Sequence, residues 1–163
     1  MSIEPLHLTL SPKDIPLDQI YLDPNNPRFV SHNWQLVSDA DIVNVNNQDY
    51  ALKRLLTEFG ADKLRSNMEL NGYLPIDRII VRSIGSNKYV VLEGNRRIAA
   101  AKSIGTVNSS GEPVNSAVTE SLKIIPALEY TGSDSQAAWV FQGLRHITGI
   151  SDWSAYNLSL IHI

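Results

Sequence analysis

The chain has 163 residues, of which 43% are hydrophobic and 19% are charged, and its formal net charge is −3. This length allows one domain with its own core, and the composition excludes a chain that is disordered throughout. The net charge excludes a uniformly basic coat for nucleic acid, but a local basic face stays open because four arginines are close in sequence: Arg78, Arg82, Arg96 and Arg97.

The lack of cysteine in the sequence excludes disulfides, thiolate metal sites and cysteine nucleophiles, and it agrees with a reducing compartment. Residues 1–10 do not have the apolar core of a signal peptide, and no apolar run is long enough to span a membrane. We therefore expect a soluble, cytoplasmic protein without a membrane partner.

The first part of the chain is predicted to contain short strands and tight turns. Leu6–Leu10 and Ile15–Leu22 have the apolar spacing of strands, and Ser11–Pro12 separates them. Asp23–Pro27 has dense turn chemistry. Residues 30–49 are rich in Asn, Asp and Ser, which favours an exposed insertion over a core element.

The middle of the chain is predicted to hold two helices and a hairpin. The apolar residues after Tyr50 have helical spacing that is interrupted near Gly60, which indicates two short helices. Asn71–Gly72 is expected to end the second helix. Two β-rich runs then flank a Gly-Ser-Asn turn and indicate a hairpin: Ile76–Ile84 and Lys88–Leu92.

The last part of the chain begins with a predicted helix over Arg96–Ile104 and a polar loop over 106–119. Leu122–Tyr130 predicts a strand, with Pro126 near a sheet edge. A helix over 133–147 should follow, capped at its first residues and buried along one stripe: Ala137, Val140, Phe141 and Leu144. This order predicts an α+β fold, a small mixed β-sheet with packed helices.

The end of the chain needs separate treatment. Residues 158–163 match the translation of a common sequencing-library adapter, and residues 153–157 have the pattern of a helix cut short after its start. The alternative is a natural apolar strand. We expect an adapter-derived tail in which His162 is no ligand candidate, a single domain over residues 1–157, and a native protein that continues beyond Asn157.

The most informative motif is Tyr89–Lys102, in which a β-branched run stops at Gly94 and an alanine-rich helical run follows. A strand-to-helix turn of this kind places backbone N–H groups, the positive end of a helix dipole and the guanidinium groups of Arg96 and Arg97 at one point. This combination indicates a phosphate site. The alternative is that both arginines are solvated, although cations are mildly unfavourable in a first helical turn.

Four segments of the chain resemble, in order and spacing, the N-terminal domain of ParB-like proteins in the ParB/sulfiredoxin superfamily: Ile15–Ile20, Asn26–Arg28, Asn71–Ile76 and Val91–Ala100. The resemblance implies a ParB/sulfiredoxin-like fold in a DNA-associated protein of a plasmid, a phage or a chromosome. ParB domains carry Gly-Glu-Arg-Arg in the turn, whereas here Asn95 replaces the acidic residue and Glu93 precedes the glycine. The sulfiredoxin reaction needs a cysteine that this chain lacks.

The resemblance also implies a nucleotide site that binds a nucleoside triphosphate, CTP or ATP, with Mg²⁺. Gly94 and the N–H groups after it would hold phosphates, and Glu93 would contact Mg²⁺ or act as a general base. Gly143–Gly149 stands where ParB has a third motif, but it contains no acidic residue. The remaining residues implied as ligand contacts are Asn95, Arg96, Arg97, Arg28, Gly72, Leu74, Pro75, Arg145 and His146.

Three functions stay open, and we rank first a nucleotide-binding regulatory module. The second is an enzyme, either a phosphotransferase with Glu93 as base or a nuclease, although metal-dependent hydrolysis of nucleic acid usually needs several carboxylates. The third is a DNA-binding partition adaptor whose helix-turn-helix lies outside this sequence. The expected partners are a nucleotide, DNA through that further region, and a second copy of the chain in a homodimer.

Overall fold

The alternating apolar runs form strands and the helically spaced runs form helices in the computed structural model, which describes residues 5–29, 35–134 and 136–148. The strands are β1 (Leu10–Pro16), β2 (Ile20–Tyr21), β3 (Ile79–Gly85), β4 (Lys88–Glu93) and β5 (Ile124–Tyr130). The helices are α1 (Asp39–Ile42), α2 (Val45–Glu58), α3 (Ala61–Asn71), α4 (Asn95–Ser103), α5 (Ser116–Ser121) and α6 (Ala137–Thr148). Short 3₁₀ helices cover Leu6–Thr9, Leu17–Gln19 and Pro27–Phe29.

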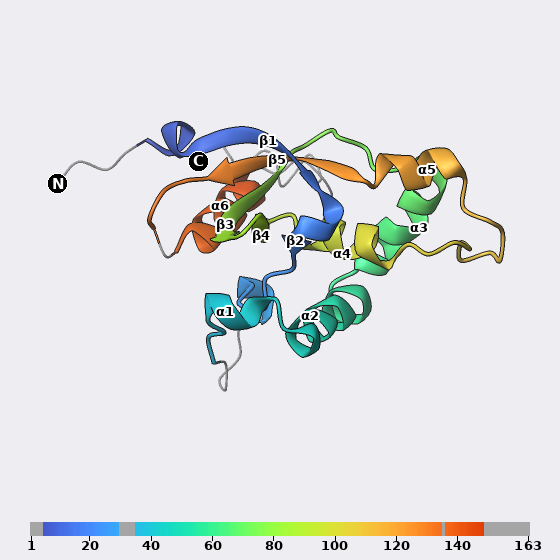
Figure 1. Cartoon of the computed structure of the whole chain (residues 1–163), viewed down its shortest axis with the longest axis horizontal. Coiled ribbons are helices and arrows are strands. Elements are labelled where there is room, and N and C mark those ends of the chain that lie inside the picture. The colour runs from blue at the N-terminus through green and yellow to red at the C-terminus, as the bar shows by residue number, and fades with distance from the viewer. Residues whose placement is uncertain (1–4, 30–34, 135, 149–163) are drawn as a thin grey trace.

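The described strands form one mixed sheet in the order β1-β5-β3-β4-β2. β1 is antiparallel to β5, β5 is parallel to β3, β3 and β4 are an antiparallel hairpin, and β2 is parallel to β4. In Figure 1, β1 lies along the upper edge of the sheet, and α1 and α2 lie below β2. This arrangement confirms the predicted α+β class with a small mixed sheet.

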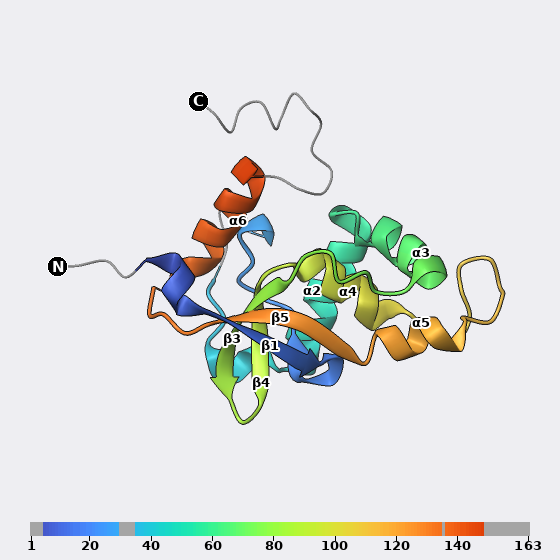
Figure 2. The same cartoon turned by 90° about the horizontal axis from the view of Figure 1, so that it is seen from above.

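Successive side chains of a strand point to opposite faces of the sheet, and here both faces pack against helices. Ile79 and Val81 of β3 face the main core, which is built with α2, α3, α4 and α5. Ile80, between them, faces a smaller core in which Leu92 of β4 packs with Phe141 of α6. α6 therefore lies apart from α3 and α5, as Figure 2 shows. Among the described residues, no helix is long and apolar enough to cross a bilayer.

The two helices and the hairpin predicted for the middle of the chain are confirmed, although the first strand of the hairpin begins at Ile79 and not at Ile76. Gly60, with φ of 80°, separates α2 from α3, and Gly72, with φ of 76°, ends α3. The hairpin turn has Ser86 at φ 50° and Asn87 at φ 59°, the left-handed pair that suits the twist of a two-residue hairpin. These features depend on local backbone conformation, which turn residues specify well.

Two prolines occupy positions that the sequence patterns placed incorrectly. Ser11–Pro12 does not separate two strands but lies within β1, and the residues before it, Leu6–Thr9, form a 3₁₀ helix. Among the described strands, β1 is at an edge and pairs only with β5, so the missing N–H of Pro12 removes no bond to a second strand. Pro126 belongs to the interior strand β5, but pairing with β3 begins only at Ala127.

Other boundaries also differ from the prediction. The segment 106–119, expected as a loop, includes the start of α5, whose Val118 is buried. Within 30–49, α1 and the first turn of α2 are present, and Ile42 is fully buried. In the predicted stripe of α6, Leu144 is 41% exposed whereas Phe141 is buried. Residues 158–163 and His162 lie outside the described residues.

Candidate functional site

The turn between β4 and α4 can be formed only with glycine at position 94. Gly94 has φ of 108° and ψ of 17°, a left-handed conformation that a side chain disfavours. A Cβ atom there would also lie 2.5 Å from Cγ2 of Ile79 on the neighbouring strand. As the N-cap of α4, Gly94 offers no side-chain acceptor to the N–H groups of the first turn, which contains no acidic residue. The turn thus leaves the positive end of the helix uncapped by side chains at that position.

Asn95 connects this turn to the loop that follows β2. Its side chain is buried, its Oδ1 accepts the Asp23 backbone N–H at 2.9 Å, and its Nδ2 donates to the Val91 carbonyl at 3.3 Å. The Asn95 side chain, at the position where ParB domains carry an acidic residue, therefore links the loop after β2 to the end of β4. Both polar atoms of the Asn95 side chain thus have partners within the chain.

Glu93, the last residue of β4, and Arg97 of α4 are four residues apart in the sequence and form a largely buried ion pair. Arg97 Nη2 is 3.9 Å from Glu93 Oε2, and the two side chains are 19% and 14% exposed. Arg97 Nη1 donates to the Asp77 carbonyl, 2.6 Å away, in the segment between α3 and β3. Arg97 is thus held by a neighbouring backbone, while its second terminal nitrogen faces toward Glu93 without hydrogen-bonding to it.

Arg28 joins the same group of charges from the 3₁₀ helix Pro27–Phe29. Burial is the main cause that lowers the pKa of Arg28, the positive charge of Arg96 lowers it further, and Glu93 opposes the shift. These effects require Arg28, Arg96 and Glu93 to lie near one another. The tertiary fold therefore brings together residues from two segments that are distant in the sequence.

Three buried side-chain atoms of the described residues have no hydrogen-bond partner, and all three are donors: Asn26 Nδ2, Tyr73 Oη and Arg97 Nη2. Asn26 lies next to the turn, because Gln142 of α6 donates from its Nε2 both to Asn26 Oδ1 and to the Leu92 carbonyl, each at 3.3 Å. Burial is the main cause that raises the pKa of Tyr73, and the opposing effect of Arg97 shows that the two side chains are near each other. The unsatisfied donors therefore frame one turn.

In the part of the chain that the structure describes, the other residues predicted as ligand contacts make no hydrogen bond or ion pair with the β4–α4 turn. Gly72 is required by the end of α3, because a Cβ there would lie 2.9 Å from Ser121 Oγ. Leu74 and Pro75 are exposed. Arg145 and His146 belong to α6, but their side chains lie outside the described part of the chain.

Sequence reasoning missed Tyr73, Asn26 and Gln142. Tyr73 and Asn26 belong to segments that the resemblance covers, and the signal that could have found Tyr73 is a polar-tipped aromatic among apolar neighbours. Gln142 had no such signal, because its role depends on where α6 docks.

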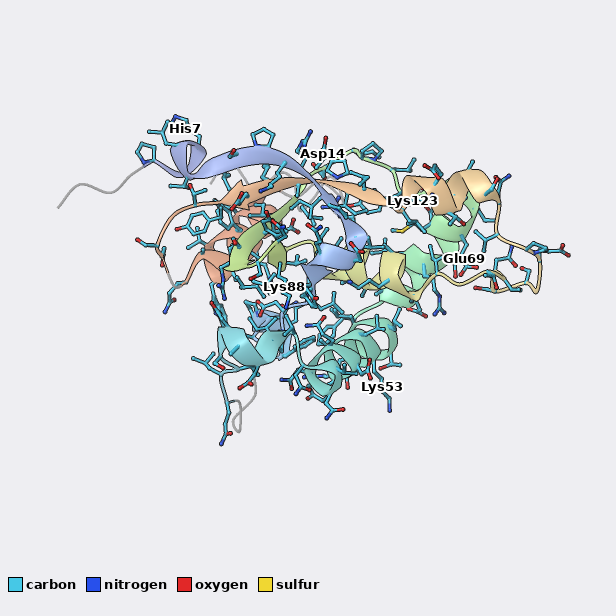
Figure 3. All side chains as sticks on the ribbon, in the orientation of Figure 1. His7, Asp14, Lys53, Glu69, Lys88 and Lys123 are labelled. Carbon is cyan, nitrogen blue, oxygen red and sulfur yellow. The ribbon has the colours of Figure 1, made fainter. Side chains whose placement is uncertain are left out.

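The four arginines that are close in sequence do not form one basic face, because two of them are paired with aspartates. Arg78 pairs with Asp14 at 3.3 Å, and Arg82 makes two bonds to Asp39, at 2.9 and 2.7 Å. Figure 3 places Lys53 on α2 and Lys123 before β5 on different sides of the molecule. The positive charge of the turn is local: Arg28, Arg96 and Arg97 lie there with two carboxylates, Glu93 and Asp77.

At the turn, a metal ion would be held by the Glu93 carboxylate together with oxygen atoms of a bound ligand. In the described ranges, no group of three or more His, Cys, Asp or Glu side chains could hold a metal ion. Mg²⁺ is commonly held by one or two carboxylates together with substrate phosphates. Glu93 fits that role in the presence of a phosphate chain.

A groove of about 630 Å³ lies at the other end of α4, lined among others by Leu17, Lys102, Leu122 and Lys123. It includes none of the turn residues. Lys102 Nζ donates to the Leu17 carbonyl at 3.3 Å, and Lys123 pairs with Glu120 at 2.8 Å. The turn, with its unpartnered donors, is therefore the candidate site.

Comparison with family models and with curated proteins gives no match for this chain. Comparison with solved structures finds the C-terminally truncated chromosome-partitioning protein ParB from Caulobacter crescentus, complexed with CTP-gamma-S. The TM-score is 0.46 and the sequence identity is 14%, over 92% of this chain. The matched region is 59% of the length of that ParB chain.

Proposed function

We propose that the β4–α4 turn binds the phosphate groups of a nucleoside triphosphate together with Mg²⁺, so that the domain is a regulatory nucleotide-binding module. The observation that carries this proposal is the set of buried donors without acceptors around the turn. Burying one unsatisfied donor costs about 1–3 kcal/mol, so three such donors at one place favour a ligand rich in acceptor oxygens. A phosphate chain is such a ligand.

Each residue of the turn has a distinct part in the proposal. The backbone N–H groups after Gly94 would donate to phosphate oxygens at the positive end of α4. Arg28, Arg96 and Arg97 would neutralise the negative charge. Burial is the main cause that lowers the pKa of Arg28, and the positive charge of Arg96 lowers it further. An anion between the two arginines would relieve their repulsion.

Glu93 would hold the Mg²⁺ that accompanies the phosphates, directly or through water. The metal would neutralise phosphate charge and screen it from the Glu93 carboxylate. The association of the module with DNA rests on the resemblance of its motifs to ParB-like domains, in segments that include Asn26–Arg28 and Val91–Ala100.

The proposal is tested by titrating the protein with CTP and with ATP in the presence of Mg²⁺, by calorimetry, and by assaying the same samples for released phosphate. Arg97→Ala should weaken binding on the order of tenfold to a hundredfold, because a charge-assisted contact is worth about 1.5–3 kcal/mol. Phosphate release on the timescale of binding would replace the regulatory function with an enzymatic one.

The matched control is Arg82→Ala, which removes an arginine whose charge is already paired with Asp39 on the surface. This variant should bind nucleotide like the parent protein. Equal losses in the two variants, or no binding of either nucleotide by the parent protein, would refute the phosphate site.

A further inference from the structure

The groove at the C-terminal end of α4 lies apart from the turn site. Its volume of about 630 Å³ is within the range of small-molecule sites, roughly 300–1,000 Å³. The lining comes from three parts of the chain: the end of β1 with the 3₁₀ helix after it, the end of α4, and the junction of α5 with β5. The tertiary fold therefore builds this groove from segments that are far apart in the sequence.

Much of the lining is apolar. Leu17 and Ile104 are partly buried and pack against the main core, Leu122 is 7% exposed, and Ile124 is 51% exposed. A ligand that covers these side chains removes apolar surface from water, which is favourable. The groove therefore suits a ligand with an apolar body.

Lys102 adds a cation to this apolar lining. Its Nζ donates to the Leu17 carbonyl at 3.3 Å and lies 5.7 Å from the centre of the Tyr21 ring. An ammonium group has three N–H donors, and the described residues give it this one acceptor and no ion-pair partner. Burial is the main cause that lowers the pKa of Lys102, and the charge of Asp18 opposes that shift.

The other polar groups of the groove are already matched or exposed to water. Lys123, labelled in Figure 3, lies 2.8 Å from a carboxylate oxygen of Glu120. At the ends of the two helices, the Ala101 and Thr119 carbonyls accept backbone N–H groups. Asp18 is exposed, so that water and salt screen its charge. The charge that lacks a close partner is thus the ammonium of Lys102.

We propose that this groove binds a small organic acid with an apolar body, whose carboxylate pairs with Lys102 Nζ. The apolar part covers Leu122 and Ile124, and the carboxylate accepts the N–H donors that Lys102 does not use on Leu17. The groove contains none of the residues of the turn, so this site is separate from the proposed nucleotide site.

The test measures the binding of octanoate by calorimetry, with 1-octanol and octylammonium as the neutral and cationic analogues. Octanoate should bind about tenfold more tightly than 1-octanol, because a charge-assisted hydrogen bond is stronger than a neutral one. Lys102→Met keeps an unbranched apolar side chain and removes the charge. It should weaken octanoate binding on the order of tenfold and leave 1-octanol binding unchanged.

The matched control is Lys123→Met, which removes the groove lysine that is paired with Glu120 and should keep the preference for octanoate. Thr119→Trp tests the site without changing a charge. Thr119 is exposed on α5 and lines the groove, so the large ring should fill the space and abolish binding of octanoate and of 1-octanol.

Four results would overturn the inference. They are no octanoate binding by the parent protein, equal affinity for octanoate and 1-octanol, tighter binding of octylammonium, and octanoate binding that survives Thr119→Trp. An equal loss in Lys102→Met and Lys123→Met would also contradict the pairing with Lys102. Nucleotide titrations of the parent protein test the turn site alone, so failure of either proposal leaves the other standing.

Discussion

Glu93 could serve as an ion-pair partner of the arginines or as a ligand of Mg²⁺, and the two roles predict different responses to Mg²⁺. It ends β4, it is 3.9 Å from Arg97 Nη2, and its charge acts on Arg28 and Tyr73. As an ion-pair partner it would stabilise the arginines in the fold. As a metal ligand it would add affinity only when Mg²⁺ is present.

We expect Glu93→Gln to keep the fold and to bind nucleotide without Mg²⁺ within severalfold of the parent protein. The glutamine has the same shape, and it removes a negative charge that repels phosphates. The gain in affinity that Mg²⁺ gives the parent protein should be lost. Calorimetric titrations with and without Mg²⁺ measure both effects.

The control for this experiment is Glu129→Gln, which alters a partly exposed carboxylate paired with Lys13 on the surface. It should retain the response to Mg²⁺. A Glu93→Gln variant that melts at a lower temperature but responds normally to Mg²⁺ would identify Glu93 as a structural partner of the arginines.

At the scale of elements, β3, β4 and α4 meet at one glycine. The hairpin brings Ile79 of β3 against the turn, so that the space for a Cβ at Gly94 is already filled. The close contact between strand and turn fixes where α4 begins. The position of its first-turn N–H groups is therefore set by packing as well as by backbone conformation.

Gly94→Ala should lower the free energy of unfolding by about 2–5 kcal/mol, from the left-handed backbone and the clash with Ile79 together. Gly60→Ala provides the comparison, because Gly60 has φ of 80° but a Cβ at that position would have no neighbour within 4 Å. That variant should lose about 1–2 kcal/mol, the backbone contribution alone. Urea unfolding of both variants measures the difference, and equal losses would contradict a role for Ile79.

At the scale of the whole molecule, Asp23 couples the loop after β2 to the sheet and to α4. Its backbone N–H bonds to Asn95, and its carboxylate accepts the Asn25 backbone N–H at 2.8 Å. Burial raises the pKa of Asp23 to about 6, the Asn25 N–H and the charge of Arg82 oppose the shift, and Asp39 adds to it. The folded chain therefore favours the protonated carboxyl.

The stability of the protein should consequently fall as the pH rises through 6. The folded pKa lies above the ordinary value of 3.8, so the folded state holds the proton more tightly than the unfolded state between these values. From pH 5 to 7.5 this group should reduce the free energy of unfolding by about 1–2 kcal/mol. Urea unfolding at several pH values measures the trend.

Asp23→Asn should remove that part of the pH dependence and raise stability at pH 7.5, since an amide oxygen can still accept the Asn25 N–H. Asp14→Asn, at an exposed carboxylate, is the control and should leave the trend between pH 5 and 7.5 in place. The same pH profile in the parent protein and in Asp23→Asn would show that Asp23 is not its source.

The sequence by itself determined the features that depend on neighbouring residues. The break between α2 and α3 at Gly60, the hairpin turn at Ser86 and Asn87, and the start of α4 after Gly94 all follow from backbone preferences within a few residues. The α+β class followed as well, because hydrophobic periodicity is also a local property.

Only the tertiary structure decided which distant groups meet. It hydrogen-bonded the Asn95 side chain to the Asp23 backbone, and it left three buried donors near the turn without a hydrogen-bond partner, whereas the proximity of Arg28 to Arg96 is implied by the resemblance. It also put Pro12 inside an edge strand, which depends on the order of strands in the sheet. These outcomes depend on packing between segments far apart in the chain, for which the local pattern of a single sequence carries no signal.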